Sequence, residues 1–317
     1  MKPPYTITAT IIQLIADIAE KIGAINSTLL IKEAPTLRKQ NRIRTIQASL
    51  AIEGNTLTVD QITALIENKR VLGPNKDIQE VTNAIEVYNQ IQQLKPNSEK
   101  SFLLAHKKLM KGLIPNPGQY RKSGVGIVKG TQLTHLAPPA KNIPYLMKDL
   151  FGYLKTSDDP IFLKSCVFHY EMEFIHPFTD GNGRMGRLWQ TILLIQSYPL
   201  FEYLPFETTI SKNQKAYYKA LSNSDKKGES TEFIEFMLHT INTALDELLK
   251  ERIEPITNDN RITLFLAANK NPFSRKDYLN YFKSISTATA SRDLSKAVKE
   301  KRIKKMGEKN KTIYKLA

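Results

Sequence analysis

The stretch His176-Pro177-Phe178-Thr179-Asp180-Gly181-Asn182-Gly183-Arg184-Met185-Gly186-Arg187 combines a histidine, a carboxylate, a glycine-rich turn and two arginines within twelve residues. Residues 161–175 before it carry apolar side chains at helical spacing, and Pro177 cannot continue a helix. Residues 184–197 after it are again mostly apolar and helical in pattern. The sequence therefore predicts two helices joined by this loop, with His176 at the end of the first.

The loop between the two helices has the composition of an anion-binding turn. Gly181 and Gly183 permit positive φ angles, and the unpaired amides at a helix N-terminus attract negative charge. Arg184 and Arg187 lie three residues apart on one helical face, where their charge opposes the helix dipole. Because an external anion would relieve that opposition, we expect the turn to bind phosphate.

Two further groups add chemistry to the predicted phosphate site. Asp180 supplies a hard oxygen ligand of the kind that magnesium prefers, and a histidine such as His176 exchanges protons near neutral pH. With a polyphosphate and a divalent cation bound, His176 would accept a proton from an attacking hydroxyl. A lone Asn-Gly pair is usually only a turn, and a lone histidine at a helix end is usually only a cap. The prediction of function therefore depends on the combination.

At these residues the sequence resembles the Fic (filamentation induced by cAMP) domain family, whose signature is His-Pro-Phe-x-(Asp/Glu)-Gly-Asn-Gly-Arg-x-x-Arg, and every fixed position is present. The resemblance implies a mainly α protein, a helical bundle with a small β-hairpin flap. It also implies transfer of AMP from ATP to a Ser, Thr or Tyr hydroxyl of a target protein, with His176 as general base and Asp180 as the Mg²⁺ ligand. ATP would be held by Gly181, Asn182, Gly183, Arg184, Met185, Gly186 and Arg187. The residues alone predict phosphate binding; attack at the α-phosphorus comes from the resemblance.

A second motif, Ser49-Leu50-Ala51-Ile52-Glu53-Gly54-Asn55, ends a helix expected over residues 36–52, with Glu53-Gly54-Asn55 as a left-handed cap. It matches the inhibitory pattern (Ser/Thr)-x-x-x-Glu-(Gly/Asn) of many Fic proteins, which assigns Ser49, Glu53 and Gly54 an inhibitory role. A glutamate near a helix C-terminus is locally unfavourable, which indicates a cationic partner elsewhere. The resemblance names Arg187 as that partner. The alternative is that Glu53 is a solvated charge at a helix end.

Two other segments match the family less closely. Residues 121–139 alternate small and apolar side chains around a turn, which predicts a short β-hairpin in the place of the flap where a target segment docks. Its alternative is a plain surface turn, and the pattern does not fix its register. Tyr217 and Tyr218 resemble tyrosines of the family's adenine pocket, whereas tyrosines on a helix are usually core residues.

The remaining histidines and the cysteine are expected to have structural roles. His169 lies on the helix before His176, and we interpret it as a hydrogen-bonded core histidine because no third metal ligand matches it. The other histidines show no ligand spacing, namely His106, His135 and His239. Cys166 is the single cysteine, so it forms no internal disulfide, and it is expected to fill the core.

Helical patterns cover most of the chain outside the loop. A first helix is expected to end at Gly23, others over residues 78–94 and 101–113, and one over 232–252. Thr58-Val59-Asp60-Gln61 has the pattern of a capping box. The predicted domains are an N-terminal helical domain over residues 1–95 with the inhibitory helix, a Fic catalytic core over 96–254, and a winged-helix domain over 255–317.

The C-terminal pattern of three helices and a hairpin is typical of a winged helix, with residues 286–299 in the recognition position. Residues 256–317 carry 15 Lys+Arg and 5 Asp+Glu, so most of the chain's net charge of +15 lies there. Arg292, Lys296 and Lys299 make DNA a candidate partner. Such modules also serve as protein docking surfaces, and we favour protein docking or a structural role.

Composition limits the remaining classes. The 317 residues suffice for two or three domains, no apolar run approaches the roughly 20 residues that span a bilayer, and no signal peptide is visible. We therefore expect a cytoplasmic protein, and by resemblance a homodimer capable of self-AMPylation. The alternatives are a DNA-binding regulator with a nucleotide-sensing Fic body, or a Fic enzyme that removes AMP or transfers another phosphate-containing group. The complete signature favours the adenylyltransferase.

Overall fold

The computed structural model describes the backbone of residues 2–27, 35–124, 126–129, 132–252, 261–263, 265–266, 269, 272–282, 285–307 and 312–316, and their side chains except at 26–27, 35–37, 126–129, 132–136 and 251–252. The chain forms two compact units, one of residues 1–22 with 41–246 and one of residues 23–40 with 247–317. The division into domains at residues 95 and 254 stays a prediction.

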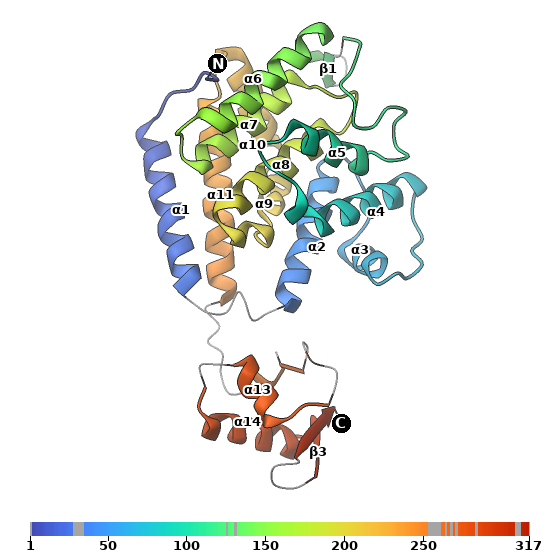
Figure 1. Cartoon of the computed structure of the whole chain (residues 1–317), viewed down its shortest axis with the longest axis vertical. Coiled ribbons are helices and arrows are strands. Elements are labelled where there is room, and N and C mark those ends of the chain that lie inside the picture. The colour runs from blue at the N-terminus through green and yellow to red at the C-terminus, as the bar shows by residue number, and fades with distance from the viewer. Residues whose placement is uncertain are drawn as a thin grey trace. The chain divides into compact units, whose positions relative to one another are not determined.

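The first unit begins with helix α1 (Ala9–Ser27), whose apolar face includes Ile11, Ile18 and Ile22. The predicted end of this helix at Gly23 is wrong, because glycine also adopts helical angles and Ile25 continues the buried face beyond it. Figure 1 shows α1 beside the long helix α11 (Thr231–Arg252). The salt bridge from Lys21 Nζ to Asp246 Oδ1 at 2.6 Å joins these two helices.

The next helices carry the inhibitory motif and its surroundings. They are α2 (Pro35–Ala51), α3 (Val59–Ile66) and α4 (Asn75–Asn89), followed by a short 3-10 turn, η2 (Ile91–Gln93). Gly54 has a φ of 91°, so the chain leaves α2 through a left-handed glycine as predicted. Thr58 caps α3 with Gln61 in a capping box, which confirms that sequence signal.

The middle of the chain contains helices and one hairpin. After α5 (Glu99–Leu109) come β1 (Gly126–Lys129) and β2 (Gln132–Leu136), which pair antiparallel with an irregularity between Ile127 and Val128. The hairpin is thus confirmed. Helix α5 ends earlier than the predicted residue 113, since Gly112 adopts a positive φ of 74° that no helix continues through. A 3-10 turn, η3 (Ala140–Asn142), leads into α6 (Ile143–Thr156).

The core of the first unit lies around helices α7 (Ile161–Ile175) and α8 (Asn182–Ser197). Four aromatic rings from four successive helices meet there: the ring of Phe102 lies 5.6 Å from Phe151, 6.0 Å from Phe168 and 5.1 Å from Trp189 between centroids. The chain closes through η4 (Pro199–Glu202), α9 (Phe206–Lys212), α10 (Gln214–Lys227) and α11. A mainly α bundle with a small hairpin is therefore confirmed.

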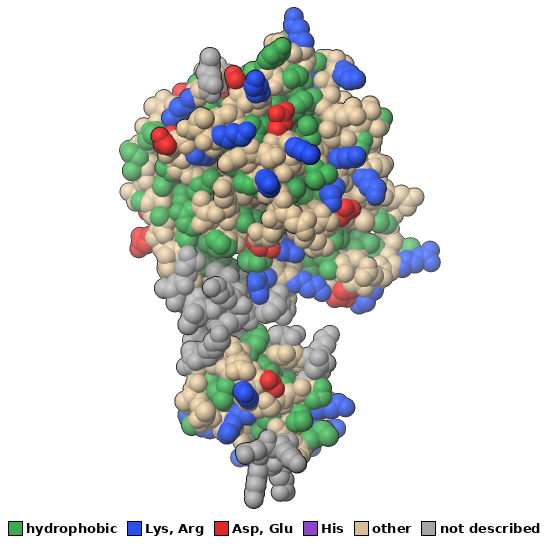
Figure 2. Space-filling view, in the orientation of Figure 1, with side chains coloured by type: hydrophobic (Ala, Val, Ile, Leu, Met, Phe, Trp, Pro, Cys, Tyr) green, Lys and Arg blue, Asp and Glu red, His purple; other side chains and the backbone are tan. Residues whose placement is uncertain are grey.

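The C-terminal part of the second unit contains α13 (Arg275–Tyr281), α14 (Thr287–Lys299) and the antiparallel strands β3 (Ile303–Met306) and β4 (Ile313–Leu316). Its own core includes Phe265, Tyr278 and Leu294. Ser274 and Ser286 cap the two helices, and Figure 2 shows Lys and Arg side chains on the visible face. The assignment of this arrangement as a winged helix stays a prediction.

No helix among the described residues is both long enough and apolar enough to cross a lipid bilayer.

Candidate functional site

The loop between α7 and α8 begins at a backbone reversal. His176 ends α7 with φ 47° and ψ 59°, a left-handed conformation that is costly for a residue with a Cβ. Its amide still donates to Met172 O at 3.1 Å, and Pro177 has no amide with which to extend the helix. The reversal turns the His176 side chain to the edge of a cavity of about 790 Å³.

Asn182 closes the loop through its side chain. Its Oδ1 accepts the amide of Phe178 at 2.9 Å, and its Nδ2 donates to the carbonyl of Phe178 at 2.9 Å. Gly181, at a φ of 86°, makes the turn that starts α8 at Asn182, two residues before the predicted start. The amides of the first helical turn have no acceptor within their own helix, so they are available to an anion.

His106 supports the loop from α5, although sequence spacing gave it no role. The amide of Gly118 donates to Nδ1 at 2.8 Å, so Nε2 carries the proton and donates to Asp180 O at 3.0 Å. The imidazole also stacks on Phe178 at 3.5 Å between centroids. Burial lowers the pKa of His106 to about 4, which keeps the ring neutral at physiological pH.

Arg121 connects the predicted flap to the same loop. Its Nε donates to His176 O at 2.7 Å, its Nη1 to Ser123 O at 2.8 Å, and its Nη2 to Pro138 O at 2.6 Å. Its amide also donates to Pro177 O at 2.9 Å. One guanidinium thus holds both ends of the hairpin segment against the end of α7, a role that no sequence motif signalled.

The cavity brings together most of the predicted site residues. Its lining includes Glu53, His176, Asp180, Gly181, Asn182, Gly183, Arg187, Tyr217 and Tyr218, together with Glu173, Phe174, Thr179, Lys215, Lys219, Leu221, Ser222 and Asp225. Residues from the end of α2, from α7, from the loop and from α10 therefore face one space. Five predicted residues are not part of this lining: Ser49, Gly54, Arg184, Met185 and Gly186.

Arg187 is fully buried and holds the end of α2. Its Nη2 donates to Glu53 Oε1 at 2.7 Å and to Ser49 O at 2.9 Å, and its Nε donates to Ser49 Oγ at 3.0 Å. Burial alone would lower the pKa of Arg187, but Glu53, Tyr217 and Glu173 together more than offset it, so the net shift is upward. Gly183 permits this approach, because a Cβ there would collide with Glu53 Oε1.

Arg184, Met185 and Gly186 do not line the cavity but contact residues around it. Arg184 is 4% exposed, and its guanidinium pairs with Glu80 Oε1 and with Asp180 Oδ1, each at 3.0 Å. Met185 is fully buried, and a Cβ on Gly186 would lie 2.6 Å from the ring of His169. The structure therefore places Arg184 as a brace between α4 and the loop, and Arg184 is not among the residues that line the cavity.

The two tyrosines differ in their surroundings. Tyr217 is 1% exposed, and its hydroxyl lies 3.0 Å from His169 Nε2 and 3.4 Å from Glu173 Oε1. Tyr218 is 39% exposed beside the cavity. His169 is a buried, hydrogen-bonded histidine as expected, with Nδ1 2.6 Å from Gln190 Oε1. Tyr217 thus belongs to the core and to the cavity wall at once.

Asp180 fits a Mg²⁺ ion whose other ligands would be substrate phosphates and water. Its side chain is 50% exposed, and Oδ1 accepts the Gly181 amide at 2.6 Å. The described residues include no cluster of three acidic, histidine or cysteine side chains able to hold a metal alone. Mg²⁺ commonly takes one or two carboxylates and completes its octahedron with phosphate and water oxygens, so one exposed carboxylate beside a phosphate site fits this ion.

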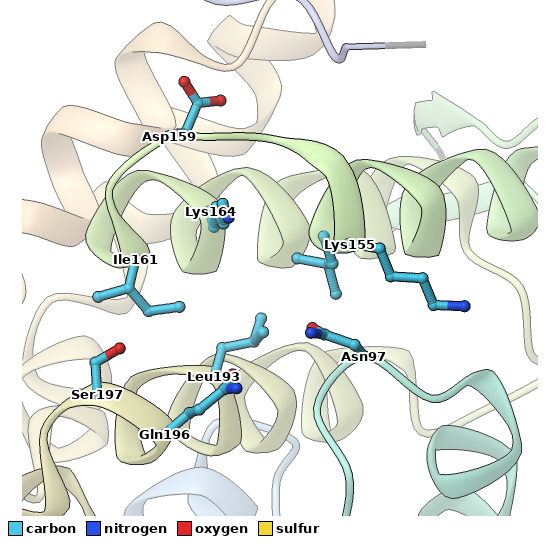
Figure 3. Close-up of a pocket in the computed structure, with 9 residues that line it drawn as sticks. Asn97, Lys155, Asp159, Ile161, Lys164, Leu193, Gln196 and Ser197 are labelled. Carbon is cyan, nitrogen blue, oxygen red and sulfur yellow. The ribbon is translucent and has the colours of Figure 1, made fainter.

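A second cavity of about 510 Å³ lies between α6, α7 and α8 (Figure 3). Lys155, Lys164 and Asn97 line it, but none of the signature residues does. Its carboxylate, Asp159, is engaged by Lys2 Nζ at 3.0 Å and by the Tyr153 hydroxyl at 2.9 Å. Chemistry is therefore expected in the first cavity.

Comparison with known proteins places this geometry in a family. The model of the Fic/DOC family matches residues 96–194. The protein adenylyltransferase Fic of Nematostella vectensis is 28% identical over 226 residues, covering 67% of this chain and 49% of that protein. A probable protein adenylyltransferase of Aquifex aeolicus is 30% identical over 186 residues, covering 56% and 53% respectively. The chain spans about half the length of these two relatives.

One solved structure is similar over nearly the whole of both chains. It is the crystal structure of a Fic family protein from Desulfovibrio desulfuricans G20, with 42% identity and a TM-score of 0.78. The match covers 100% of this chain and 98% of the other. Similarity of this extent and identity shows that the chain belongs to the Fic family.

Proposed function

We propose that the protein transfers AMP from ATP to the hydroxyl of a Ser, Thr or Tyr residue of a target protein. The observation that carries the proposal is the single cavity in which His176, the Gly181–Gly183 loop and Arg187 meet. Two relatives support the same reaction, one named as a protein adenylyltransferase and the other as a probable protein adenylyltransferase.

The residues divide the work as the reaction requires. The first-turn amides of α8 would hold the phosphates, and the guanidinium of Arg187 would bind the γ-phosphate once Glu53 releases it. The target hydroxyl attacks the α-phosphorus, His176 accepts its proton, and the bond to the bridging oxygen breaks to release pyrophosphate. Mg²⁺ held by Asp180 would neutralise phosphate charge.

In the same proposal, Glu53 inhibits the enzyme. Its ion pair with Arg187 occupies the donors that the γ-phosphate needs, and the pair lies on the cavity wall. Ser49 strengthens the hold through its hydroxyl and its carbonyl. ATP would then bind in a position unsuited to attack, and the loss of a few kcal/mol of positioning slows turnover by orders of magnitude.

Intact mass spectrometry tests both parts of the proposal. After incubation with ATP and Mg²⁺, the Glu53→Gly protein should gain the mass of AMP at least about tenfold faster than the unsubstituted chain. His176→Ala in the same background should abolish the gain. Label from α-labelled ATP should be retained on protein and label from γ-labelled ATP should not. Retention of the γ label would instead indicate phosphorylation, and equal rates with and without Glu53 would reject the inhibitory role.

The C-terminal unit is proposed to dock a protein partner, with duplex DNA as the alternative. The exposed face of α14 carries Arg292, Ser295, Lys296 and Lys299 around a shallow hollow of about 400 Å³, which suits an acidic surface. A gel shift of the full chain with duplex DNA decides between them, since phosphate contacts would give binding that weakens steeply with salt. DNA binding that persists at physiological salt would favour the alternative function, a DNA-binding regulator with a nucleotide-sensing Fic body.

A further inference from the structure

Glu173 is a carboxyl group of the cavity for which the proposed reaction has no use. It lies on α7, three residues before His176, and its side chain is 13% exposed. A Cβ placed on Gly183 would collide with Glu53 Oε1 and would lie 3.1 Å from Arg187 Nη1 and 3.4 Å from Glu173 Oε1. Two carboxyl groups and one guanidinium therefore converge on the same side of the Gly183 backbone.

The hydrogen bonds of this trio leave one guanidinium nitrogen unused. Nε and Nη2 of Arg187 donate to Ser49 and Glu53, whereas Nη1 is buried and finds no hydrogen-bond acceptor among the described residues. Among the described residues, Glu173 Oε1 has a long contact with the Tyr217 hydroxyl at 3.4 Å and lies 3.9 Å from His169 Nε2. A buried N–H without an acceptor thus faces the same point as an under-used carboxyl group.

We infer that Glu173 is a second carboxyl partner of Arg187 whose ionisation loosens the grip of Glu53, so that inhibition weakens as pH rises. This inference rests on the proposed inhibitory role of Glu53. It adds a positioning residue on α7 to the inhibitory pair.

Charge counting gives the direction of the effect. Burial, followed by the charge of Glu53, raises the pKa of Glu173 to about 7, so the neutral and ionised forms coexist near physiological pH. When Glu173 is neutral, Glu53 is the one carboxylate that faces the guanidinium of Arg187. When Glu173 is ionised, two carboxylates share that guanidinium. Coupling is reciprocal, so a carboxylate that raises the pKa of Glu173 must itself be repelled when Glu173 ionises. Ionised Glu173 is also a stronger acceptor for the Nη1 N–H than the neutral acid.

Other groups around Glu173 do not account for a change in this pH range. The pKa of His169 is lowered to about 3 by burial, and the pKa values of Tyr217 and Tyr218 are raised by burial. Asp225, on α10, adds a further repulsive charge that favours the neutral form of Glu173. Lys215 and Lys219 also line the cavity from α10. His176 also lines the cavity, so the experiment compares two proteins that both contain it.

The experiment is a ratio of rates. AMP incorporation is measured at about pH 6 and about pH 8 for the full chain and for Glu53→Gly. At each pH, the rate of the unsubstituted chain is divided by the rate of Glu53→Gly. His176 is present in both proteins, so its direct effect on the rate divides out and the ratio reports the hold of Glu53 on Arg187. We expect the ratio to rise at least about threefold with pH, since one pKa unit of coupling corresponds to a factor of ten. With Glu173→Gln in both proteins, the ratio should stay at its low-pH value.

Glu171→Gln is the matched control. Glu171 lies on the same helix, and burial with Asp225 raises its pKa to about 7 as well, but it is not among the residues that line the cavity. Its substitution should leave the pH dependence of the ratio intact. A flat ratio in the unsubstituted protein, a ratio that still rises in Glu173→Gln, or one that is flattened equally by Glu171→Gln, would each overturn the inference.

A measurement without turnover separates this inference from the proposed function. Calorimetric titration with ATP and Mg²⁺ in the His176→Ala background, which transfers no AMP, gives the affinity ratio of the chains with and without Glu53→Gly at both pH values. If Glu53→Gly binds ATP but transfers no AMP, the proposed function fails, while a pH-dependent affinity ratio that Glu173→Gln removes would still support the inference. A pH-independent affinity ratio would reject the inference even if AMP transfer is observed.

Discussion

His106 shows how a single side chain distant in the sequence shapes the loop between α7 and α8. It lies 74 residues before Asp180, whose carbonyl accepts its Nε2 proton at 3.0 Å, and it has no pattern in common with the signature. The hydrogen bond from Gly118 fixes the tautomer and the stack on Phe178 fixes the ring plane. A neutral imidazole is required, because a protonated Nδ1 could not accept from Gly118.

Replacing His106 by Gln should therefore destabilise the protein in a pH-dependent way. The folded pKa of about 4 lies below the ordinary value of 6.5, so its contribution is present above about pH 6.5 and lost as pH falls toward 4. The contribution amounts to roughly 3 kcal/mol. In urea denaturation, the deficit of His106→Gln should be largest at neutral pH and shrink on acidification. His239→Gln, at an exposed position of α11, should show no comparable loss at neutral pH. A deficit that does not change with pH would contradict this account.

Gly183 is a position where the absence of a side chain keeps space open beside Arg187. A side chain there would point at Arg187 Nη1 and Glu173 Oε1. In the proposed function the phosphates bind beside Arg187. In the Glu53→Gly background, Gly183→Ala should weaken ATP binding about tenfold or more, measured by calorimetry. Gly152→Ala on α6 is the control, because a Cβ there meets nothing within 4 Å, and it should leave affinity unchanged. Unchanged affinity in Gly183→Ala would place the phosphate elsewhere.

At the scale of elements, α4 holds the turn that carries Glu53. Asn55 Nδ2 donates to Asp77 O at 3.1 Å and to Glu80 Oε2 at 2.9 Å, while Glu80 Oε1 binds Arg184 at 3.0 Å. The end of α2 and the start of α8 are therefore fastened to the same carboxylate. This connection makes the inhibitory turn and the loop parts of one polar network.

Asn55→Ala should loosen that network at the inhibitory turn. The lost hydrogen bonds of a buried amide cost about 1–3 kcal/mol in denaturation, and Glu53 should leave Arg187 more often. We expect faster AMP incorporation than in the unsubstituted chain, but slower than in Glu53→Gly. Asn116→Ala at an exposed site should change neither quantity. Destabilisation without any gain in rate would mean that α4 does not hold the inhibited state.

The same elements show what local sequence can and cannot predict. Helices α7 and α8, the capping box of Thr58 and the left-handed Gly54 follow from spacing and residue type within a few positions, and all are found. The continuation of α1 past Gly23 was missed because a glycine does not by itself end a helix whose apolar face goes on.

Partners distant in sequence have no local signal. Arg121 reaches the carbonyl of His176 across 55 residues, and Glu80 reaches Arg184 across 104. For the same reason the sequence does not distinguish the surroundings of the two signature arginines. Arg187 lines the cavity, whereas Arg184 does not line it and pairs with Glu80. Only the packing of α4 against the loop assigns them different surroundings.

At the scale of the whole molecule, the unit that carries the cavity and the basic C-terminal part have separate cores. The hydrophobic cluster of the C-terminal part consists of residues between Ile262 and Ile303, with none from the helices that carry the cavity. The residues that line the cavity lie between Glu53 and Asp225. The buried pair of Arg261 Nε and Asp293 Oδ2 at 2.8 Å is likewise contained within the C-terminal part. Activity and docking should therefore be separable by truncation.

A Glu53→Gly chain ending at residue 252 should keep its chemistry. Because the truncation removes no residue of the cavity lining, self-modification should stay within about twofold of the full-length variant, and ATP affinity should be unchanged. Modification of a docked target should fall instead, seen as loss of labelled target in a lysate to which α-labelled ATP is added. Charge reversal at Arg292, Lys296 and Lys299 in the full-length variant is the control, since it should lower target labelling while leaving the fold of α14 intact, measured by melting. Loss of self-modification on truncation would show instead that the C-terminal part takes a direct share in the chemistry.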